Sequence, residues 1–410
     1  MAKTSKAERQ AIIIGGSISG LFAALLLQRH GWQVEVLERT GGELAGRGAG
    51  VVAQPELREA LAAAGIGDIA AVGVTVETRI LLDRDGREMM RFPCPQTVTS
   101  WERVRGLLRA HLDDRCYHDG IDVKAIEQDA NRATVVLANG DRRHADLVIG
   151  ADGIRSTIRQ QLFPEAQPQY AGYVAWRSLI DERALPPDVH ERIFWKFAFG
   201  LPPGEQFLVY PVTGANDDMT PGHLRTNMIW YRPADEMELT RLLTDTAGRV
   251  HSLSIPPPLI RPEVRAEISE AAERLLAPDY RVCVGLSPQA FLQPIYDVAS
   301  TRLAEGRVAI IGDAAFVARP HLAAGIIKAA DDVLALVRYL DEAADVPIAL
   351  QGYEAERVKV GRRIVAKARE MGASYKARPA GAPPAPSSHD AAYAKIVVEE
   401  TALTTFLREG

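Results

Sequence analysis

Short, uninterrupted apolar runs near both ends of the chain predict buried parallel strands. One run at residues 11–14 ends in glycines, and helical spacing of apolar positions follows over residues 19–30, before a second run at 34–37. Strand, helix and strand in this order form a βαβ unit, because a parallel strand pair needs a crossover connection. A comparable run returns at 307–311, followed by a helical pattern at 323–340. We therefore expect the two ends of the chain to build one α/β layer.

The middle of the chain has a different pattern. From Tyr170 to Ile255, aromatic and β-branched residues are frequent, and helical spacing is weak until Leu239. Such residues favour the half-buried surface of a sheet. The pattern predicts a mostly antiparallel β region that is inserted between the two α/β segments and covers a ligand. Strands are expected at 134–137, 146–149, 174–179, 207–210 and 227–231, a hairpin at 79–91, and helices at 56–64, 102–112 and 263–276.

Two segments have the composition of loops. Residues 41–50 contain five glycines, and residues 378–388 are rich in Pro, Ala and Ser. The second segment has too few apolar side chains to offset the entropy of ordering it. We therefore expect a flexible tether there, followed by a final helix at 391–408, and we expect a chain truncated after Lys376 to stay active.

Composition and charge narrow the function classes. The 410 residues carry a formal net charge of -5, so no basic surface for nucleic acid is expected. No window resembles a membrane-spanning helix or a secretory signal. Cys94, Cys116 and Cys283 lie far apart without metal-ligand spacing, which predicts reduced thiols, no metal site and a cytoplasmic location. A charge run at 354–359 is interpreted as a solvated helix face.

The first candidate motif is the glycine-rich turn GGSISG at residues 15–20, between the first strand and its helix. Gly15 permits a tight turn, the small Ser17 permits close approach of a pyrophosphate, and Gly20 lets the helix pack closely on the strand. Glu38 ends the second strand about 20 residues further on, where a carboxylate accepts hydrogen bonds from a ribose diol. A purely structural turn and a solvated carboxylate are the alternatives. The ordered set favours dinucleotide binding and does not separate NAD from FAD.

Two further motifs follow strands. ADG at residues 151–153 is, by itself, a common strand-to-turn sequence. GDAA at 312–315 is followed by RPHLAAG at 319–325, which shapes the start of a helix. Asp313 is placed to bind a second polyol, and the N-terminus of a helix stabilises an anion. Reduced flavin is such an anion, so this motif favours a flavin.

Together, GGSISG, ADG and GDAA…P resemble the class A FAD-dependent aromatic monooxygenases, the group that includes p-hydroxybenzoate hydroxylase. The resemblance covers residues 11–372 and implies bound FAD, NADH or NADPH as co-substrate, and O2. It implies that O2 adds at flavin C4a and that the resulting hydroperoxide hydroxylates an electron-rich ring. It assigns the ADP half of FAD to the glycine turn and the strand-end acid, joint use of FAD and NAD(P)H to ADG, and the ribityl chain to the GD acid. The cofactor-binding residues expected are Gly15, Ser17, Ile18, Ser19, Gly20, Glu38, Arg39, Val51, Arg105, Asp152, Asp313, Ala323, Ala324 and Gly325.

The resemblance also implies the fold. We expect an α/β protein in which a Rossmann-like FAD-binding domain carries an inserted, mostly antiparallel β substrate domain. A homodimer is compatible with this arrangement. The expected FAD-binding domain is 1–78, 98–168 and 281–376, the substrate domain is 79–97 and 169–280, and the linker and tail helix are 377–410.

Five stretches resemble the dihydroxypyridine hydroxylases within that class: GGSISGL, GAGVVAQPEL, YAGYVAWRS, VIGADG and GDAAFVARPHLAAG. The expected substrate is therefore a small hydroxylated aromatic ring, with 3-hydroxylation of 2,6-dihydroxypyridine as the best guess. Two positions depart from the broader family: Phe316 replaces a histidine and Ile327 replaces an asparagine. Contacts to the pyrimidine edge of the flavin are then expected from the backbone.

Three residues are the catalytic candidates. His321 precedes the expected flavin helix, and its unperturbed pKa of roughly 6.5 suits proton exchange with a ring hydroxyl. A hydrogen-bonded pocket histidine without chemistry is the alternative. Pro320 lies beside it, and Tyr210 ends a strand where it faces the ring or packs in the core. Trp176 and Arg177 are interpreted as a packing pair in a sheet rather than as substrate contacts.

Other functions stay open on this scaffold. A hydroxylase of another phenol fits the same motifs, and so does a flavin halogenase or reductase, although the Trp-x-Trp-x-Ile-Pro signature of halogenases is absent. A dinucleotide-binding regulator without turnover is the alternative of a different class. Asp313 and the helix start after it argue against a regulator, because a regulator does not need to place a flavin ring.

Overall fold

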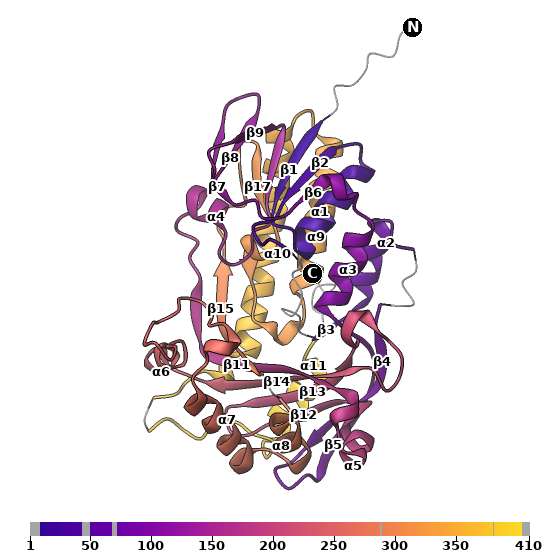
Figure 1. The fold of residues 1–410 in the computed structure, drawn as a ribbon, viewed down its shortest axis with the longest axis vertical. Helices are drawn as coiled ribbons and strands as arrows, with labels where there is room; N and C mark the ends of the chain where they lie inside the picture. The colour runs from indigo at the N-terminus through magenta and orange to yellow at the C-terminus, as the bar shows by residue number, and fades with distance from the viewer. Residues whose placement is uncertain (1–8, 43–49, 68–71, 288, 380, 404–410) are drawn as a thin grey trace.

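The computed structural model describes residues 9–42, 50–67, 72–287, 289–379 and 381–403. It has two halves, each built on one large sheet (Figure 1). Most of the glycine-rich loop expected at 41–50 lies outside the described residues.

The first half is built on a six-stranded sheet. Its strands are β1 (Gln10–Ile14), β2 (Gln33–Leu37), β6 (Tyr117–His118), β10 (Leu147–Gly150), β16 (Ala304–Glu305) and β17 (Val308–Ile310). They lie in the order β16-β17-β10-β1-β2-β6, and every neighbouring pair is parallel except β16 and β17. Ile13, Val36 and Ile149 are fully buried, as expected for parallel strands covered on both faces. The sheet confirms the predicted α/β layer made from both ends of the chain.

Helices and a small sheet cover this layer. α1 (Ile18–Arg29) packs on β1 and β2, α9 (Gly325–Glu342) lies beside α1, and α10 (Val346–Met371) packs on α9. A three-stranded sheet, β7-β8-β9, packs against β1 and β10. Its strands are Val123–Gln128, Ala133–Leu137 and Arg142–Ala145, and the remaining helices of this half are α2 (Pro55–Ala63), α3 (Trp101–Ala110) and α4 (Thr157–Leu162).

The second half is built on a nine-stranded sheet. Its strands are β3 (Gly50–Val52), β4 (Val74–Leu82), β5 (Glu88–Ser100), β11 (Gln169–Asp181), β12 (Phe197–Gly200), β13 (Gln206–Val212), β14 (Arg225–Pro233), β15 (Phe291–Ala299) and β18 (Phe316–Val317). The order is β18-β15-β11-β14-β13-β12-β4-β5-β3, and only β12 and β4 are parallel neighbours. The mostly antiparallel character and the β4–β5 hairpin are confirmed. In Figure 1, α5 (Pro187–Val189), α7 (Pro262–Leu275) and α8 (Pro278–Gly285) lie on the side of this sheet away from the first half, and α6 (Glu236–Leu242) lies near its edge.

The two halves share segments of the chain. β15 and β18 belong to residues that the sequence analysis assigns to the FAD-binding domain, yet they pair with each other and, through β11, with the nine-stranded sheet. β3 likewise joins this sheet through β5. The chain therefore crosses between the halves several times, and a cavity between them receives residues from both.

The segment after α10 is packed rather than free. The Gly204 N–H donates to the Pro386 carbonyl, and the Ser388 N–H donates to the Leu201 carbonyl. α11 (Ala391–Glu400) follows and buries Val397 and Val398 in the core of the second half. The prediction of a flexible tether is therefore wrong, because backbone hydrogen bonds and an apolar helix face fix the segment in place.

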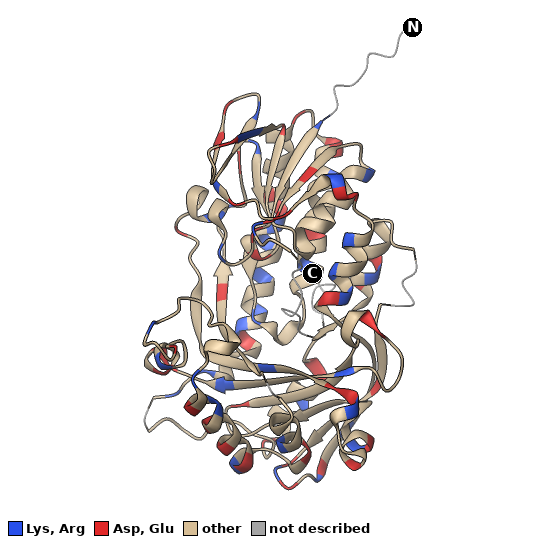
Figure 2. Cartoon of the chain, viewed as in Figure 1, with Lys and Arg blue, Asp and Glu red and all other residues tan. Residues whose placement is uncertain are grey.

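The charge run on α10 is also not simply a solvated face. Arg357 is buried and its Nε donates to Asp332 Oδ1 at 2.8 Å, while Glu354 accepts the N–H groups of Leu303 and Ala304. Acidic and basic residues are intermixed over both halves in Figure 2. The sequence alone does not separate the buried charges from the exposed ones.

Candidate active site

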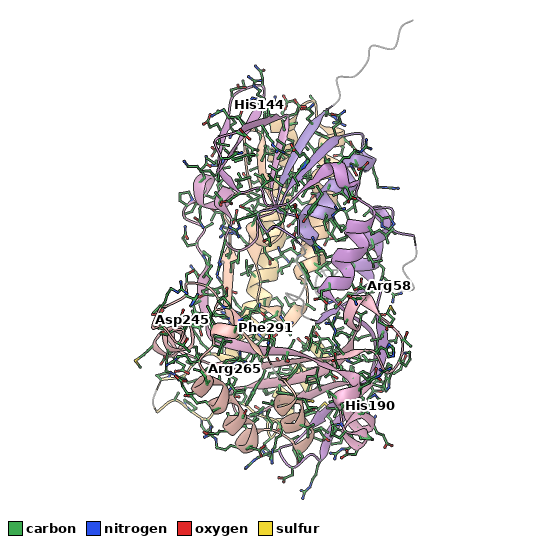
Figure 3. All side chains as sticks on the ribbon, in the orientation of Figure 1. Arg58, His144, His190, Asp245, Arg265 and Phe291 are labelled. Carbon is green, nitrogen blue, oxygen red and sulfur yellow. The ribbon has the colours of Figure 1, made fainter. Side chains whose placement is uncertain are left out.

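Two neighbouring cavities lie along the motifs. The first has a volume of about 270 Å³ and is lined by the glycine turn, the end of β2 and the ADG turn. The second has a volume of about 450 Å³ and lies between the start of α9 and one face of the nine-stranded sheet. Trp101, the first residue of α3, lines both. Phe291, labelled in Figure 3 between the two halves, lines the second cavity.

The glycine turn leaves no room for side chains. Gly15 has φ +111°, and a Cβ atom there would lie 2.3 Å from the carbonyl oxygen of Ala151. A Cβ atom on Gly20 would lie 1.9 Å from the Gly15 carbonyl oxygen. The turn therefore packs β1, α1 and the ADG segment closely together. α1 begins at Ile18, so the N–H groups of Ile18 and Ser19 have no acceptor within the helix. Gly15 and Ser17 line the first cavity.

Glu38 is held at the end of β2, in the wall of the first cavity. Its Oε2 accepts the Gly16 N–H at 2.7 Å and its Oε1 accepts the Thr40 N–H at 2.8 Å. Arg39 lines the same cavity. The carboxylate is thus oriented by the backbone before any ligand binds.

Arg105 reaches the glycine turn through a tyrosine. Its Nη2 donates to Tyr117 Oη at 3.2 Å, and that hydroxyl donates to the Gly16 carbonyl at 3.3 Å. Arg105 also lies over the Trp101 ring, 6.0 Å from its centroid. Tyr117 had no signal in the sequence, because it follows a short 3₁₀ turn in an irregular stretch.

Asp152 accepts the first N–H groups of α4 and keeps one carboxylate oxygen unused. Its Oδ2 accepts the Thr157 N–H at 2.7 Å, and its Oδ1 is buried without a hydrogen-bond partner among the described residues. Burial raises the pKa of this carboxyl group. A buried, unused acceptor in the wall of the first cavity is suited to a donor from a ligand.

Arg159, on α4, ties the ADG turn to the GDAA turn. Its guanidinium donates to the Ala314 carbonyl at 2.9 Å and to the Asp313 and Gly153 carbonyls at 3.5 Å, and it also contacts the Ile154 carbonyl. Arg159 is fully buried, and burial lowers its pKa. The sequence analysis did not single it out, because an arginine on a short helix has the same pattern whether it is buried or solvated.

Asp313 lies in the second cavity with its side chain 57% exposed. Behind it, Lys328 on α9 is fully buried, and its Nζ lies 3.8 Å from Asp313 Oδ1. Within the described part of the chain, this ammonium has no hydrogen-bond partner. Asp332 on the same helix accepts the Gly312 N–H at 3.1 Å and pairs with Arg357. Buried charges behind the turn therefore fix the aspartate so that its carboxylate faces the cavity.

The start of α9 opens into the second cavity. Ala323, at φ +49°, Ala324 and Gly325 line it. The Ala323 N–H donates to the Pro320 carbonyl at 3.0 Å, so the unpaired N–H groups that a ligand meets there begin with those of Ala324 and Gly325. Phe316 and Ile327, the two departures from the family pattern, are buried in the core of the first half. This placement agrees with contacts from the backbone rather than from these two side chains.

One face of the nine-stranded sheet forms the opposite wall. Gln206, Leu208 and Tyr210 of β13 alternate along the strand and all line the cavity. Arg177 of β11 joins them, its Nη1 donating to Gln293 Oε1 at 2.9 Å and its Nε buried without a partner among the described residues. Trp176 turns to the opposite side of the sheet, so the interpretation of Trp176 and Arg177 as a packing pair is wrong for Arg177.

Tyr210 sits under β3. Cβ atoms added to Gly50 would lie 2.7 Å from Tyr210 Oη and from Asn227 Cγ, so only glycine fits there. Val51, the next residue, also lines the cavity. Burial raises the pKa of Tyr210 above its usual range and that of Tyr231 to about 12. The nearby positive charge of Arg177 lowers both pKa values, but its effect is smaller than that of burial. Both hydroxyls are therefore protonated and available as donors at neutral pH.

His321 lies in η7 (Pro320–Leu322), beside Pro320, and both line the cavity. Its Nε2 lies 2.7 Å from Tyr173 Oη, and rings of Tyr231 and Tyr375 pack against it. Burial, together with the charge of Arg319, lowers the pKa of His321 to about 3. The sequence-based reason for choosing this residue, an unperturbed pKa near neutrality, does not hold in the structure.

The two cavities fit FAD. Each presents the N-terminus of a long helix to a ligand and a carboxylate at its rim, Glu38 or Asp313. The glycine turn, which leaves no room for side chains, and Asp152, with its unused Oδ1, line the first cavity. An elongated ligand with a pyrophosphate, two polyols and an anionic ring uses all of these groups. Among the described residues, no group of three or more His, Cys, Asp or Glu side chains is placed to hold a metal ion, and no described helix is long and apolar enough to cross a membrane.

Comparisons with known proteins agree with this geometry. Residues 290–368 match the family described as FAD binding domain, and residues 170–297 match the family described as FAD binding domain-like. The chain is 32% identical to 2,6-dihydroxypyridine 3-monooxygenase of Paenarthrobacter nicotinovorans, over 88% of this chain and 89% of that protein. It is 28% identical to FAD-dependent urate hydroxylase of Klebsiella pneumoniae, again over 88% of this chain and 89% of that protein.

Solved structures show the same relationship. The structure of 2,6-dihydroxypyridine-3-hydroxylase from Arthrobacter nicotinovorans matches with a TM-score of 0.84 and 30% identity, over 92% of this chain and 96% of that one. A salicylate hydroxylase substrate complex, at 21% identity over 96% of this chain and 94% of that one, has a TM-score of 0.74 and shares the fold. The chain belongs to the FAD-dependent aromatic monooxygenases, with FAD as its cofactor and NAD(P)H as co-substrate.

Proposed function

We propose that this enzyme hydroxylates a small, hydroxylated N-heteroaromatic ring, with 3-hydroxylation of 2,6-dihydroxypyridine as the best single candidate. The observation that carries the proposal is the position of Arg177, a buried cation with an unused Nε, in a 450 Å³ cavity opposite the start of α9. A cation there stabilises an ionised ring hydroxyl, and hydroxypyridines ionise more readily than simple phenols. The relative that acts on 2,6-dihydroxypyridine supports the choice of ring.

We assign the cofactor to both cavities. The turn that binds the pyrophosphate is formed by Gly15, Ser17, Ile18, Ser19 and Gly20. The other residues assigned to the ADP half of FAD are Glu38, Arg39, Arg105 and Asp152. On the flavin side, Asp313 binds the ribityl chain and Val51 flanks the ring. The backbone at Ala323, Ala324 and Gly325 meets the pyrimidine edge of the ring, with the unpaired N–H groups of Ala324 and Gly325 as the donors. This assignment is supported by the cavity lining and by the helix N-termini.

When bound, FAD supplies hydride acceptance from NAD(P)H and the activation of O2. The protein supplies position, a dry cavity and charge. Arg177 holds the ring oxygen through charge-assisted hydrogen bonds, and the protonated hydroxyls of Tyr210 and Tyr231 are available as further donors. An electron-rich, ionised ring is thereby held between the sheet and the start of α9.

His321 keeps a different role in this proposal. With a pKa of about 3, it is neutral at physiological pH, so we assign it a neutral hydrogen-bonding role with Tyr173 rather than that of a proton acceptor. Pro320 shapes the loop that carries it. An ionisable base is not required where the bound ring is already an anion.

The test is oxygen-dependent NADH or NADPH consumption with 2,6-dihydroxypyridine, with the product identified by mass. We expect one added oxygen per ring. If a benzoate or a simple phenol is hydroxylated and the pyridine is not, the pyridine assignment is wrong and the broader class stands. A homodimer stays a prediction, which sedimentation of the FAD-loaded protein tests.

A further inference from the structure

The C-terminal segment forms part of the substrate cavity. Thr401 and Ala402, just after α11, line the 450 Å³ cavity together with residues of the sheet face and of η7. Nothing in their sequence marks them as site residues, since they follow a Pro-rich connection and a short helix. Their position in the cavity wall needs a physical explanation.

Buried polar groups of the second half hold α11 at its C-terminal end. The fully buried Arg79, on β4, donates from Nη1 to the Val398 carbonyl at 2.6 Å and to the Glu399 carbonyl at 3.3 Å. A cation at the last carbonyls of a helix satisfies acceptors that have no partner within the helix. Arg79 is itself oriented by Gln96, whose Oε1 accepts from both Nε and Nη2.

The residues after α11 are bound to the loop before the flavin helix. The Ala402 N–H donates to the His321 carbonyl at 2.7 Å. Gln54 Nε2 donates to the Ala402 carbonyl at 3.2 Å and to the Leu322 carbonyl at 3.3 Å, so one amide joins the tail to η7. Ala402 has φ +58°, a left-handed conformation that costs a non-glycine residue energy and persists only where contacts enforce it. The tail is thus anchored from both halves at the cavity wall.

Gln206 faces this wall with an unused acceptor. Its side chain lines the cavity, its residue is fully buried, and its Nε2 lies 3.5 Å from Thr401 Oγ1. Its Oε1 has no hydrogen-bond partner in the regions that the structure describes. A buried amide oxygen without a partner costs about 1–3 kcal/mol, and a donor on a ligand in the cavity removes that cost.

We propose that Gln206 and Thr401 form a substrate subsite that accepts a hydrogen bond from a ring N–H or O–H, and that the segment 401–403 closes the cavity behind it. This inference rests on the proposed function for the ring. It adds polar side chains that hydrogen-bond to the side of the ring that Arg177 does not contact. The Thr401 hydroxyl both accepts from Gln206 and donates to the ring. The subsite favours a ring that offers an ionised oxygen to Arg177 and a second hydroxyl group to Gln206 and Thr401, as singly ionised 2,6-dihydroxypyridine does.

The first experiment measures binding to the FAD-loaded enzyme through changes in flavin absorbance, with 2,6-dihydroxypyridine and with resorcinol as probes. Gln206→Leu and Thr401→Val are expected to raise the dissociation constant of the better-bound probe about tenfold. Thr401→Ser should bind the probe with wild-type affinity, because serine keeps the hydroxyl group. Ile396→Ala, on the exposed side of α11, is the matched control. Wild-type affinity in both Gln206→Leu and Thr401→Val overturns the subsite.

The same data separate the two proposals. If the wild-type enzyme binds resorcinol and not the pyridine, the proposed substrate is wrong, and weakened resorcinol binding in the two variants still supports the subsite. If it binds neither probe, the subsite as proposed is overturned together with the substrate.

The second experiment tests closure without a substrate. A variant that ends at Glu400 is compared with the full chain for quenching of flavin fluorescence by iodide. We expect at least twofold stronger quenching in the shortened variant, with FAD retained. Equal quenching in both proteins overturns the closing role of residues 401–403. If the shortened variant does not fold, Ala402→Pro, which removes the N–H that binds His321, gives the same comparison.

Discussion

The two cavities of this enzyme are built in different ways. The first is lined mainly by turns at strand ends and a helix start, where the backbone passes close to the ligand and side chains are excluded, as at Gly15. The second has a wall of side chains from β11, β13, β14 and β15, which face one side of a sheet at alternate positions. A backbone site cannot be altered without refolding its turn, whereas a side-chain wall changes one residue at a time. We therefore expect cofactor binding and substrate choice to respond separately to substitution.

The largest effect is expected from Arg159→Met. The guanidinium satisfies carbonyls of both the ADG and GDAA turns, so its removal leaves several buried acceptors unpaired. We expect the free energy of unfolding to fall by about 3–5 kcal/mol and the FAD dissociation constant to rise at least 100-fold. Urea unfolding and FAD titration measure both. Arg142→Met, which breaks an exposed pair with Glu127, is the control and should stay within about 0.5 kcal/mol.

Arg177→Met tests the other cavity. Loss of a charge-assisted hydrogen bond to an ionised ring should lower kcat/KM about 10- to 150-fold, which corresponds to about 1.5–3 kcal/mol. The FAD dissociation constant should change less than about twofold, because Arg177 belongs to the sheet wall. Arg177→Lys should recover only part of the loss, since an ammonium lacks the planar fork. Equal loss of FAD binding and of kcat/KM would falsify the separation of the two sites.

Asp313→Asn tests the flavin side of the second cavity. We expect the FAD dissociation constant to rise about tenfold, because a neutral amide makes weaker hydrogen bonds to hydroxyl groups than a carboxylate does. The substitution also leaves the buried Lys328 ammonium without its nearest counter-charge. Adding Lys328→Met should therefore recover stability and not FAD affinity. Recovery of both would show that Asp313 acts only as a partner of Lys328.

The smallest effect concerns acid. The unfolded His321 takes up a proton below pH 6.5, and the folded residue does so only near pH 3, so the unfolded state binds more protons between these values and folding stability falls as the pH falls. Between pH 7 and pH 5.5 this costs about 1.2 kcal/mol. Urea unfolding of the FAD-loaded wild type and of His321→Gln at the two pH values should differ by that amount. Identical losses in the two proteins would exclude a buried, neutral His321.

The sequence predicts the flavin half well because local spacing specifies a backbone path there. Gly15 directly follows β1, Gly20 lies in the first turn of α1, and Asp313 follows β17 by three residues, so their places follow from the order of elements. The substrate wall depends instead on which face of a strand meets a ligand. Alternation separates Trp176 from Arg177, but the packing of the whole sheet decides which of them lies in the cavity.

Buried charges were missed for a related reason. Arg159, Lys328 and Arg357 stand on helices at positions where an exposed charge is ordinary, and their partners are distant in sequence or are backbone carbonyls. The prediction of a flexible tether at 378–388 was wrong because it was based only on the few apolar residues in the segment itself. The composition of a segment does not show which donors the rest of the protein offers to the tail, and here these come from Arg79, Gln54 and Gln206.

The divided six-stranded sheet has a consequence for the order of synthesis. β1, β2 and β10 leave the ribosome first, and the free edge of β10 waits for β17 until the entire middle of the chain has been translated. During that interval an unpaired parallel edge is open to pairing with another chain. FAD meets a complete set of turns only after the start of α9 has emerged, and Ala402 emerges later still. Cofactor loading is therefore a late event, and the edge of β10 stays open to other chains until β17 is translated and pairs with it, unless a chaperone covers it.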